Sequence, residues 1–152
     1  MGSPNYDRAW SAFVRGVTVA HRGINRVSGG RVALRLPRGG REVWITTRGR
    51  RTGEWRRIPL LSVADGDAWV IAGSNGGQEK MPGWVFNARA DPSGRIEVGR
   101  RSWPVRFEEV HGDERERCYA LLNIPWPMYR SYQRHASRVI PVFRCVPSSS
   151  DG

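Results

Sequence analysis

Short apolar stretches separated by tight-turn signals run through this sequence, and they limit the fold more than any other feature. Asp65-Gly66 stands between two such stretches, which is a strong signal for a β-hairpin. The segments with strand character are 32–36, 43–47, 58–64, 68–73, 96–98, 103–110 and 139–145. Short strands joined by tight turns form antiparallel sheets that close on themselves. We therefore expect a mainly β fold, an antiparallel barrel of about six strands.

Helical patterns are few and short. Apolar spacing and proline placement predict three or four short helices, at about 7–21, 82–90, 113–122 and 128–136. The chain has 152 residues, which is the length of one domain with one sizeable core. We expect a single domain at 1–147, with an N-terminal helix and linker at 1–25, and a flexible tail at 148–152. Three arginines flank the aromatic face of the first helix, so peripheral membrane contact is an alternative to core packing.

The positive charge of the chain is carried almost wholly by arginine. Lys80 is the only lysine among 25 basic residues, and the formal net charge is +11. Guanidinium groups bind carboxylates and phosphates through two parallel hydrogen bonds, so the bias suits recognition of anions. Nucleic acid and an anionic membrane surface are also partners for a chain this basic.

The remaining composition argues against several other classes. Cys118 and Cys145 lack a paired spacing, which favours reduced thiols and a cytoplasmic location. The three histidines are scattered, so we expect no metal site. No apolar run approaches the roughly 20 residues that a membrane-spanning helix needs. Serine, histidine and aspartate do not occur in an order typical of a catalytic triad, so the sequence does not indicate a hydrolase.

An arginine-rich turn lies between two strand segments, and we call residues 48–57 the arginine turn. Gly49 and Gly53 allow a sharp reversal of the chain. Its arginines are Arg48, Arg50, Arg51, Arg56 and Arg57. Several guanidinium groups on one hairpin tip predict a ligand with several negative charges in a row. A solvated hairpin tip is the simpler alternative.

Five motifs follow one another in a fixed order. They are Thr46 to Gly53, Arg56 to Leu60, Ala72 to Gly77, Pro82 to Asn87, and Tyr129 with Tyr132 before Arg138 to Val142. In this order the chain resembles the deazaflavin-dependent nitroreductase and quinone reductase family from about Arg26 to Pro147. The resemblance implies a split β-barrel reductase. It also implies coenzyme F420, an 8-hydroxy-5-deazaflavin with a phosphate and an oligoglutamate tail.

The resemblance also assigns a coenzyme site to the motifs. The residues it implies are Arg50, Arg51, Thr52, Arg56, Arg57, Ile58, Pro59, Leu60, Leu61, Ala72, Gly73, Ser74, Asn75, Gly83, Trp84, Val85, Phe86 and Asn87. The arginines would meet the phosphate and the glutamate carboxylates. Residues 58–61 would run beside the ring, where a backbone made rigid by proline offers amide groups. The small residues at 72–75 and the start of the following helix would complete the site.

The acceptor side is implied by the same family. Ser74, Tyr129 and Tyr132 would act as the catalytic hydroxyls, and Trp126 with the two tyrosines would contact the acceptor. Trp126 departs from the tyrosine that some relatives carry, and Phe86 departs from a frequent histidine. The expected reaction is hydride transfer from the reduced coenzyme to a planar acceptor, a quinone, nitro or enone compound.

Two alternatives stay open at this level. The same barrel serves enzymes that use flavin mononucleotide (FMN), for which the additional arginines would have no use. A noncatalytic basic module that binds nucleic acid or lipid would need aromatic side chains on its basic face, and Trp44 and Trp55 lie beside the arginine turn. The residues do not indicate whether the protein is a monomer or a dimer.

Overall fold

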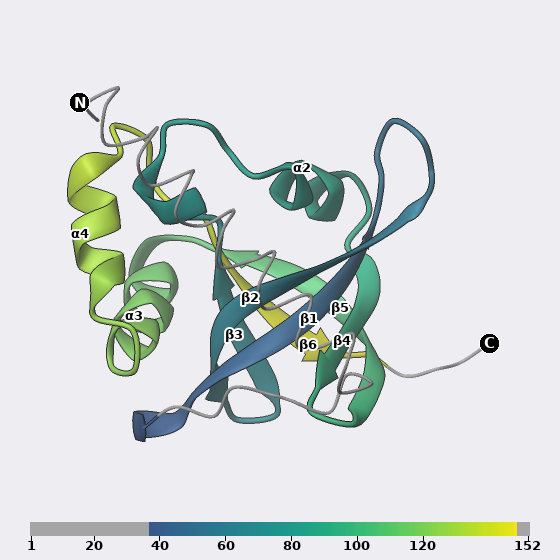
Figure 1. Ribbon diagram of the computed structural model, residues 1–152, viewed down its shortest axis with the longest axis horizontal. Helices are drawn as coiled ribbons and strands as arrows, with labels where there is room; N and C mark the ends of the chain where they lie inside the picture. Colours follow the sequence, from purple (N-terminus) through teal and green to yellow (C-terminus); the bar gives the residue numbers. More distant parts are fainter. Residues whose placement is uncertain (1–36, 149–152) are drawn as a thin grey trace, which may run out of the picture.

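The computed structural model describes residues 37–148, and these residues fold as a barrel flanked by helices (Figure 1). The described strands are β1 (Gly40–Arg48), β2 (Trp55–Asp65), β3 (Ala68–Ala72), β4 (Ser93–Val98), β5 (Arg101–Val110) and β6 (Val142–Pro147). The described helices are α2 (Gly83–Ala90), α3 (Gly112–Asn123) and α4 (Met128–His135), with 3-10 turns η1 (Pro37–Gly39) and η2 (Asn75–Gly77). The expected helix at 7–21 and strand at 32–36 lie outside the described residues.

The six strands close a barrel in the order β1-β2-β3-β6-β5-β4, and every neighbouring pair is antiparallel. This confirms the predicted mainly β fold. Three of the six strand pairs, β1–β2, β2–β3 and β4–β5, are hairpins, and turn signals in the sequence predicted them. The contacts β1–β4, β3–β6 and β5–β6 join strands that are distant in the sequence.

The interior of the barrel is apolar, and α2 closes one of its two mouths (Figure 1). Trp84, Val85 and Ala88 of α2 pack among the inward side chains. The inward side chains of the strands are Val43, Ile45, Ile71, Ile96, Val98, Val105, Phe107, Phe143 and Cys145. Alternate residues of a strand point to opposite faces, so β1, β4, β5 and β6 contribute every second residue to this cluster, and the half-buried Ile58 and Leu60 of β2 pack against it.

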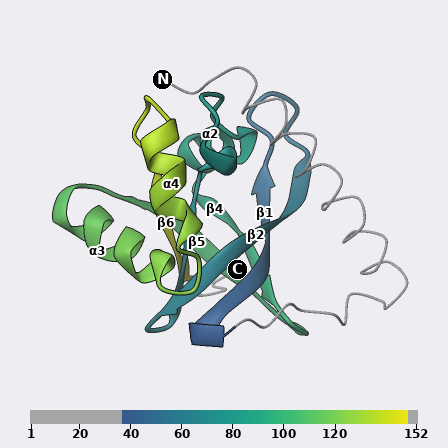
Figure 2. The ribbon, with the colours of Figure 1, turned by 60° about the vertical axis from the view of Figure 1, so that its left-hand side comes forward.

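A second apolar cluster lies outside the barrel. Figure 2 shows α3 and α4 together on one side of the strands. The cluster between them and the sheet contains Val63, Val70, Ala72, Cys118, Tyr119, Leu122, Trp126, Tyr129, Tyr132, Ala136, Ile140 and Val142. The β3 and β6 strands are therefore covered on both faces, which holds the loop after β3 against α4.

The last strand differs from its prediction. The segment 139–145 was expected to be extended, but β6 begins only at Val142. The backbone N–H of Ile140 donates to Gln133 Oε1 at 3.0 Å, and its carbonyl accepts from the buried Arg115 guanidinium. Because side chains bind this backbone, residues before Val142 are not available for the ladder. Pro82 is a smaller correction, since it is the N-cap of α2 instead of lying in its first turn.

Candidate active site

The arginine turn is an ordered hairpin tip at the α2 end of the barrel (Figure 1). The N–H of Gly49 donates to the Glu54 carbonyl, and the N–H of Gly53 donates to the Gly49 carbonyl, both at 2.7 Å. Thr52 Oγ1 accepts from the Glu54 N–H at 3.2 Å. Gly53 has a φ of 73°, a conformation that glycine adopts without steric cost. The tight turn thus presents its arginines from a defined backbone.

Asn87 of α2 ties this turn to the barrel. Its Oδ1 accepts from the backbone N–H and from the guanidinium of Arg50, both at 3.2 Å. Its Nδ2 donates to Thr47 Oγ1 at 3.4 Å, and both side chains are buried. The Arg50 guanidinium also lies 4.8 Å from the centre of the Phe86 ring. Arg50, Phe86 and Asn87, all expected in the coenzyme site, therefore come together.

Arg56 and Arg57 lie on opposite faces of β2. Arg56 pairs with Thr47, whose side chain points toward α2, so Arg56 is on the α2 side. Arg57 instead lies over the Trp44 ring at 3.9 Å and forms two hydrogen bonds with Glu97, at 2.6 and 3.1 Å. The guanidinium of Arg57 is therefore engaged on the outer face of the barrel.

Arg51 and Arg56 differ from the other arginines of the turn. Both are exposed, and neither forms a hydrogen bond or ion pair with another residue of the described segment 37–148. Arg48 contacts the Gly53 carbonyl and the Trp55 ring, and Arg50 is held by Asn87. Two unpaired guanidinium groups beside a fixed third one form a site that fits an anionic ligand.

One edge of β2 beside the turn is free of strand partners. β1 pairs with Trp55 to Val63 of β2, whereas β3 pairs only with Val63 to Asp65. Within the described residues, 55–62 therefore have a strand neighbour on one side only. Pro59 lies in this stretch, where its missing N–H costs no ladder hydrogen bond. At about 3.3 Å per residue, this edge is roughly 25 Å long, enough for an extended ligand. The expected ring-binding residues 58–61 are half-buried along it.

Ser74 and Tyr129, two of the predicted catalytic residues, are neighbours. The Ser74 side chain lies near the Tyr129 hydroxyl, and both are buried, with exposed fractions of 7% for Ser74 and 4% for Tyr129. Burial raises the pKa of the Tyr129 hydroxyl well above its usual range, so the phenol stays protonated at neutral pH. The hydroxyl of Tyr119 donates to the Tyr129 carbonyl. Ser74 and Tyr129 are therefore two neighbouring buried hydroxyl groups, of which Ser74 is slightly the more exposed.

The backbone of the loop after Ser74 is unusual. Asn75, Gly76 and Gly77 all have positive φ, at 45°, 66° and 81°. A Cβ on Gly77 would lie 2.8 Å from Tyr132 Cα, so the loop packs against α4 without space for a side chain. Tyr132 is buried, and its ring meets that of Tyr129 edge to face at 5.5 Å. Tyr132 thus supports the loop and Tyr129.

Arg138 holds the same loop and was not expected among the site residues. Its guanidinium donates to the carbonyls of Ser74 at 3.0 Å and Gln78 at 3.1 Å. Burial lowers the pKa of Arg138 from its ordinary value, and the charge of Glu79 acts in the opposite direction. Arg138 belongs to the last of the five sequence motifs, which was the only signal for it. Through these contacts, Arg138 fixes the backbone of Ser74.

Trp126 contacts β2 at a point distant from the arginine turn. Its indole N–H donates to the Ser62 carbonyl at 3.1 Å, and its side chain is 5% exposed. A Cβ on Gly40, the first residue of β1, would lie 3.1 Å from its ring. Trp126 is therefore packed beside the start of β1, whereas the arginine turn follows the end of the same strand.

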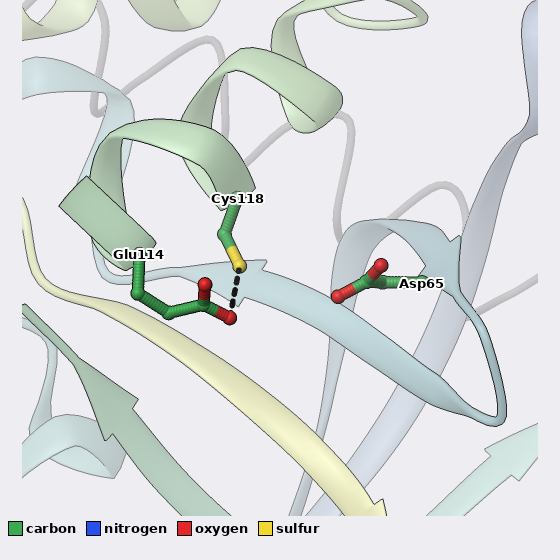
Figure 3. Close-up of side chains that lie close together, drawn as sticks. All are labelled: Asp65, Glu114 and Cys118. Atoms are coloured by element: carbon green, nitrogen blue, oxygen red, sulfur yellow. Dashed lines mark hydrogen bonds between the residues drawn. The ribbon is translucent and has the colours of Figure 1, made fainter.

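Asp65, Glu114 and Cys118 come close enough together to ligate a cation, with ligand atoms within 4.8 Å of one another (Figure 3). Arg117 already binds both carboxylates, at 2.8 Å for Asp65 and 2.7 Å for Glu114, and Arg144 binds Asp65 at 3.0 Å. A cation would have to displace these guanidinium groups. The cluster is an ion-pair network, and the expectation of no metal stays a prediction.

Known proteins resemble both this sequence and this fold. The sequence profile of the F420H(2)-dependent quinone reductase family matches residues 17–147. The F420H(2)-dependent quinone reductase Rv1261c of Mycobacterium tuberculosis is 34% identical over 125 residues, which are 80% of this chain and 84% of that protein. The fold and site define a split-barrel oxidoreductase. This chain belongs to the F420H(2)-dependent quinone reductase family.

Solved structures agree with this assignment. An F420-H2 dependent reductase, FDR-A, is 34% identical with a TM-score of 0.65, and the match covers 68% of this chain and 92% of that one. A second structure, described as a domain-swapped dimer, is 31% identical with a TM-score of 0.68, covering 89% and 98% of the two chains. Among the residues at 37–148, no helix has the length and apolar character needed to cross a membrane.

Proposed function

We propose that this chain reduces quinones with coenzyme F420 in its reduced form. The observation that carries the proposal is the pair of unpaired guanidinium groups, Arg51 and Arg56, at one end of the free β2 edge. Membership of the F420H(2)-dependent quinone reductase family supports it. The names of the Mycobacterium tuberculosis relatives give the same donor and the same class of acceptor.

The residues around the arginine turn fit this coenzyme. Arg51 and Arg56 would bind the phosphate and the tail carboxylates, with Arg50 fixed beside them by Asn87. The free edge at 58–61 would offer backbone groups to the ring, and the loop at 72–75 would close on it from the side of α4. The start of α2, 83–87, would add backbone amides to the anionic part. The reduced coenzyme supplies the hydride, so the chain needs no metal or nucleophile of its own.

The work left to the protein is positioning and proton supply. Ser74 is the slightly more exposed member of the Ser74–Tyr129 pair, and Arg138 fixes its backbone. A hydrogen bond from Ser74 to an acceptor oxygen would stabilise the negative charge that grows there. Tyr129, which remains protonated, would restore the proton through Ser74. Trp126 and Tyr132 would contribute to the binding site of the acceptor from the apolar cluster between the sheet and helices α3 and α4.

The test follows oxidation of the reduced coenzyme by its loss of absorbance, with menadione as the quinone and a nitroimidazole as the competing acceptor. We expect turnover with the quinone. Ser74→Ala should lower kcat by about 10- to 100-fold and leave coenzyme affinity unchanged, because it removes a donor that acts on the acceptor. Arg130→Ala, an exposed change on α4, serves as the control. Tight coenzyme binding without any quinone turnover would contradict the proposed activity.

A further inference from the structure

The two mouths of the barrel are built differently. Helix α2 fills one mouth (Figure 1), whereas no helix of the described residues 37–148 packs among the inward side chains at the mouth formed by the β2–β3 and β4–β5 turns. A cavity of about 910 Å³ lies there, and its lining includes Arg41, Trp69, Arg100, Arg101 and Trp103. This volume is within the range of small-molecule sites, which often occupy the mouths of β-barrels. Arg41 opens β1 and the arginine turn follows its end, so the cavity is separate from the coenzyme site.

The lining side chains belong to the inner face of the barrel. Arg41 precedes Val43 and Ile45 at every second position of β1, and both of these are inward. Trp69 pairs with the inward Cys145, and Trp103 pairs with the inward Ile96. An apolar barrel interior thus ends in two tryptophans and a ring of arginines. A rim of this kind suits a molecule with an apolar body and an anionic group.

Two donors at this mouth have no acceptor among the described residues 37–148. Arg41 Nε and Trp103 Nε1 are buried and form no hydrogen bond with any of these residues. Both groups can only donate, so only an acceptor can satisfy them. Buried donors in folded proteins nearly always have a partner. The Arg41 guanidinium lies beside Gly99, which also lines the cavity, since a Cβ built on Gly99 would be 3.2 Å from Arg41 Nη2.

The charge of the mouth selects the kind of acceptor. Three arginines face one carboxylate, Asp67, among the charged residues that line the cavity. Arg101 lies 5.6 Å from the centre of the Trp103 ring, which places cation and aromatic face together. From this geometry we infer a second ligand site at this mouth, for a small organic anion. Its carboxylate or phosphate would bind Arg41 and the Trp103 N–H, and its apolar body would lie against Trp69 and Trp103.

The experiment records the indole N–H signals of the seven tryptophans by two-dimensional NMR of the full chain. Trp103→Phe identifies the signal of Trp103. Sodium benzoate and inorganic phosphate are titrated separately at constant ionic strength, which distinguishes a carboxylate-bearing from a phosphate-bearing ligand. We expect a saturable shift of the Trp103 signal with at least one of the two probes. Arg41→Gln should weaken binding about tenfold or more, as expected for loss of a charge-assisted contact.

Arg106→Gln is the matched control, because Arg106 is exposed on β5 and does not line the cavity. It should leave the midpoint of the titration unchanged. If Arg41→Gln does not fold, Arg101→Gln replaces it with the same expected loss. A Trp103 signal that does not respond, responds without saturation, or responds equally in the arginine variants would overturn the second site. Binding of the coenzyme at the arginine turn is not involved in any of these readouts.

Discussion

Two groups of arginines in this protein have opposite surroundings. In the ion-pair network, Arg117 and Arg144 bind Asp65, and Arg117 also binds Glu114. In the arginine turn, Arg51 and Arg56 have no acceptor among the residues at 37–148. The hydrogen-bonding groups of arginine are therefore occupied by carboxylates of the protein in the network, whereas those of Arg51 and Arg56 in the arginine turn remain available to a ligand. An arginine is evidence for a binding site only when its neighbours are known.

The largest effect is expected at the unpaired arginines. Arg51→Ala and Arg56→Ala should each weaken F420 binding by about 1.5 to 3 kcal/mol, because each loses a charge-assisted contact. Thermal stability should stay within about 0.5 kcal/mol, as for other exposed substitutions. Coenzyme fluorescence and thermal unfolding measure the two quantities. Unchanged affinity in both variants would remove the anion-binding role of the turn.

Substitution of Asn87 tests whether coenzyme binding depends on the fixed position of Arg50. Asn87→Ala removes the acceptor of Arg50 and the donor to Thr47, both at a buried side chain, and should cost about 1 to 2 kcal/mol of unfolding free energy. Coenzyme affinity should fall too, because Arg50 loses its fixed position. Asn87→Asp keeps the acceptor oxygen and is the control. Chemical denaturation measures stability, and equal stability of wild type and Asn87→Ala would refute the tether.

Substitution in the ion-pair network should lower stability and leave F420 affinity unchanged, the opposite of the result expected for Arg51 and Arg56. Asp65→Asn removes the charge that Arg117 and Arg144 bind, and should cost about 1 kcal/mol of stability with no change in F420 affinity. The hydrogen bond from Arg117 lowers the pKa of Asp65, and the charges of Arg117 and Arg144 add to it. Because the folded pKa lies below the unfolded one, this stabilisation is complete above about pH 4 and is lost as the pH falls further.

Thermal unfolding from pH 7 to pH 2 measures that dependence. Wild type should lose more stability below about pH 4 than Asp65→Asn does, because the variant lacks the titrating group. Glu109 contributes in the same direction, since its hydrogen bond from Arg89 lowers its pKa. Identical acid profiles for the two proteins would show that the network does not contribute to stability.

The smallest effect is expected for Arg57. It lies within the arginine turn, but Glu97 and Trp44 already engage its guanidinium. Arg57→Ala should therefore weaken F420 binding by less than about 0.5 kcal/mol, well below the loss in Arg56→Ala. Coenzyme titration of the two variants side by side decides this. A loss in Arg57→Ala as large as that in Arg56→Ala would mean that its ion pair opens for the ligand.

Local signals predicted most of the barrel. Asp65-Gly66 located the β2–β3 hairpin, and the expected helix 113–122 lies within one residue of α3 at each end. Strand order was not predictable, because β1–β4 and β3–β6 pair residues far apart in the chain. The start of β6 was missed because Arg115 and Gln133, on two helices, bind the backbone before it.

The candidate site was predictable as a set of motifs but not as an arrangement. The arginine turn, Ser74 and Tyr129 were expected, and in the structure Ser74 lies near the Tyr129 hydroxyl. The contact between Arg50 and Asn87 spans 37 residues, and no periodicity links the two. Alternation along β2 separates Arg56 from Arg57, but which face meets α2 depends on the tertiary fold.

The most direct measurement is a fluorescence titration of the wild-type protein with oxidised F420, beside FMN and repeated at raised salt. We expect saturable binding of F420 in preference to FMN, which persists at moderate salt because several guanidinium groups of the arginine turn bind the anionic tail together. Binding of neither compound, or binding that disappears as the salt concentration rises, would contradict a coenzyme site at the arginine turn.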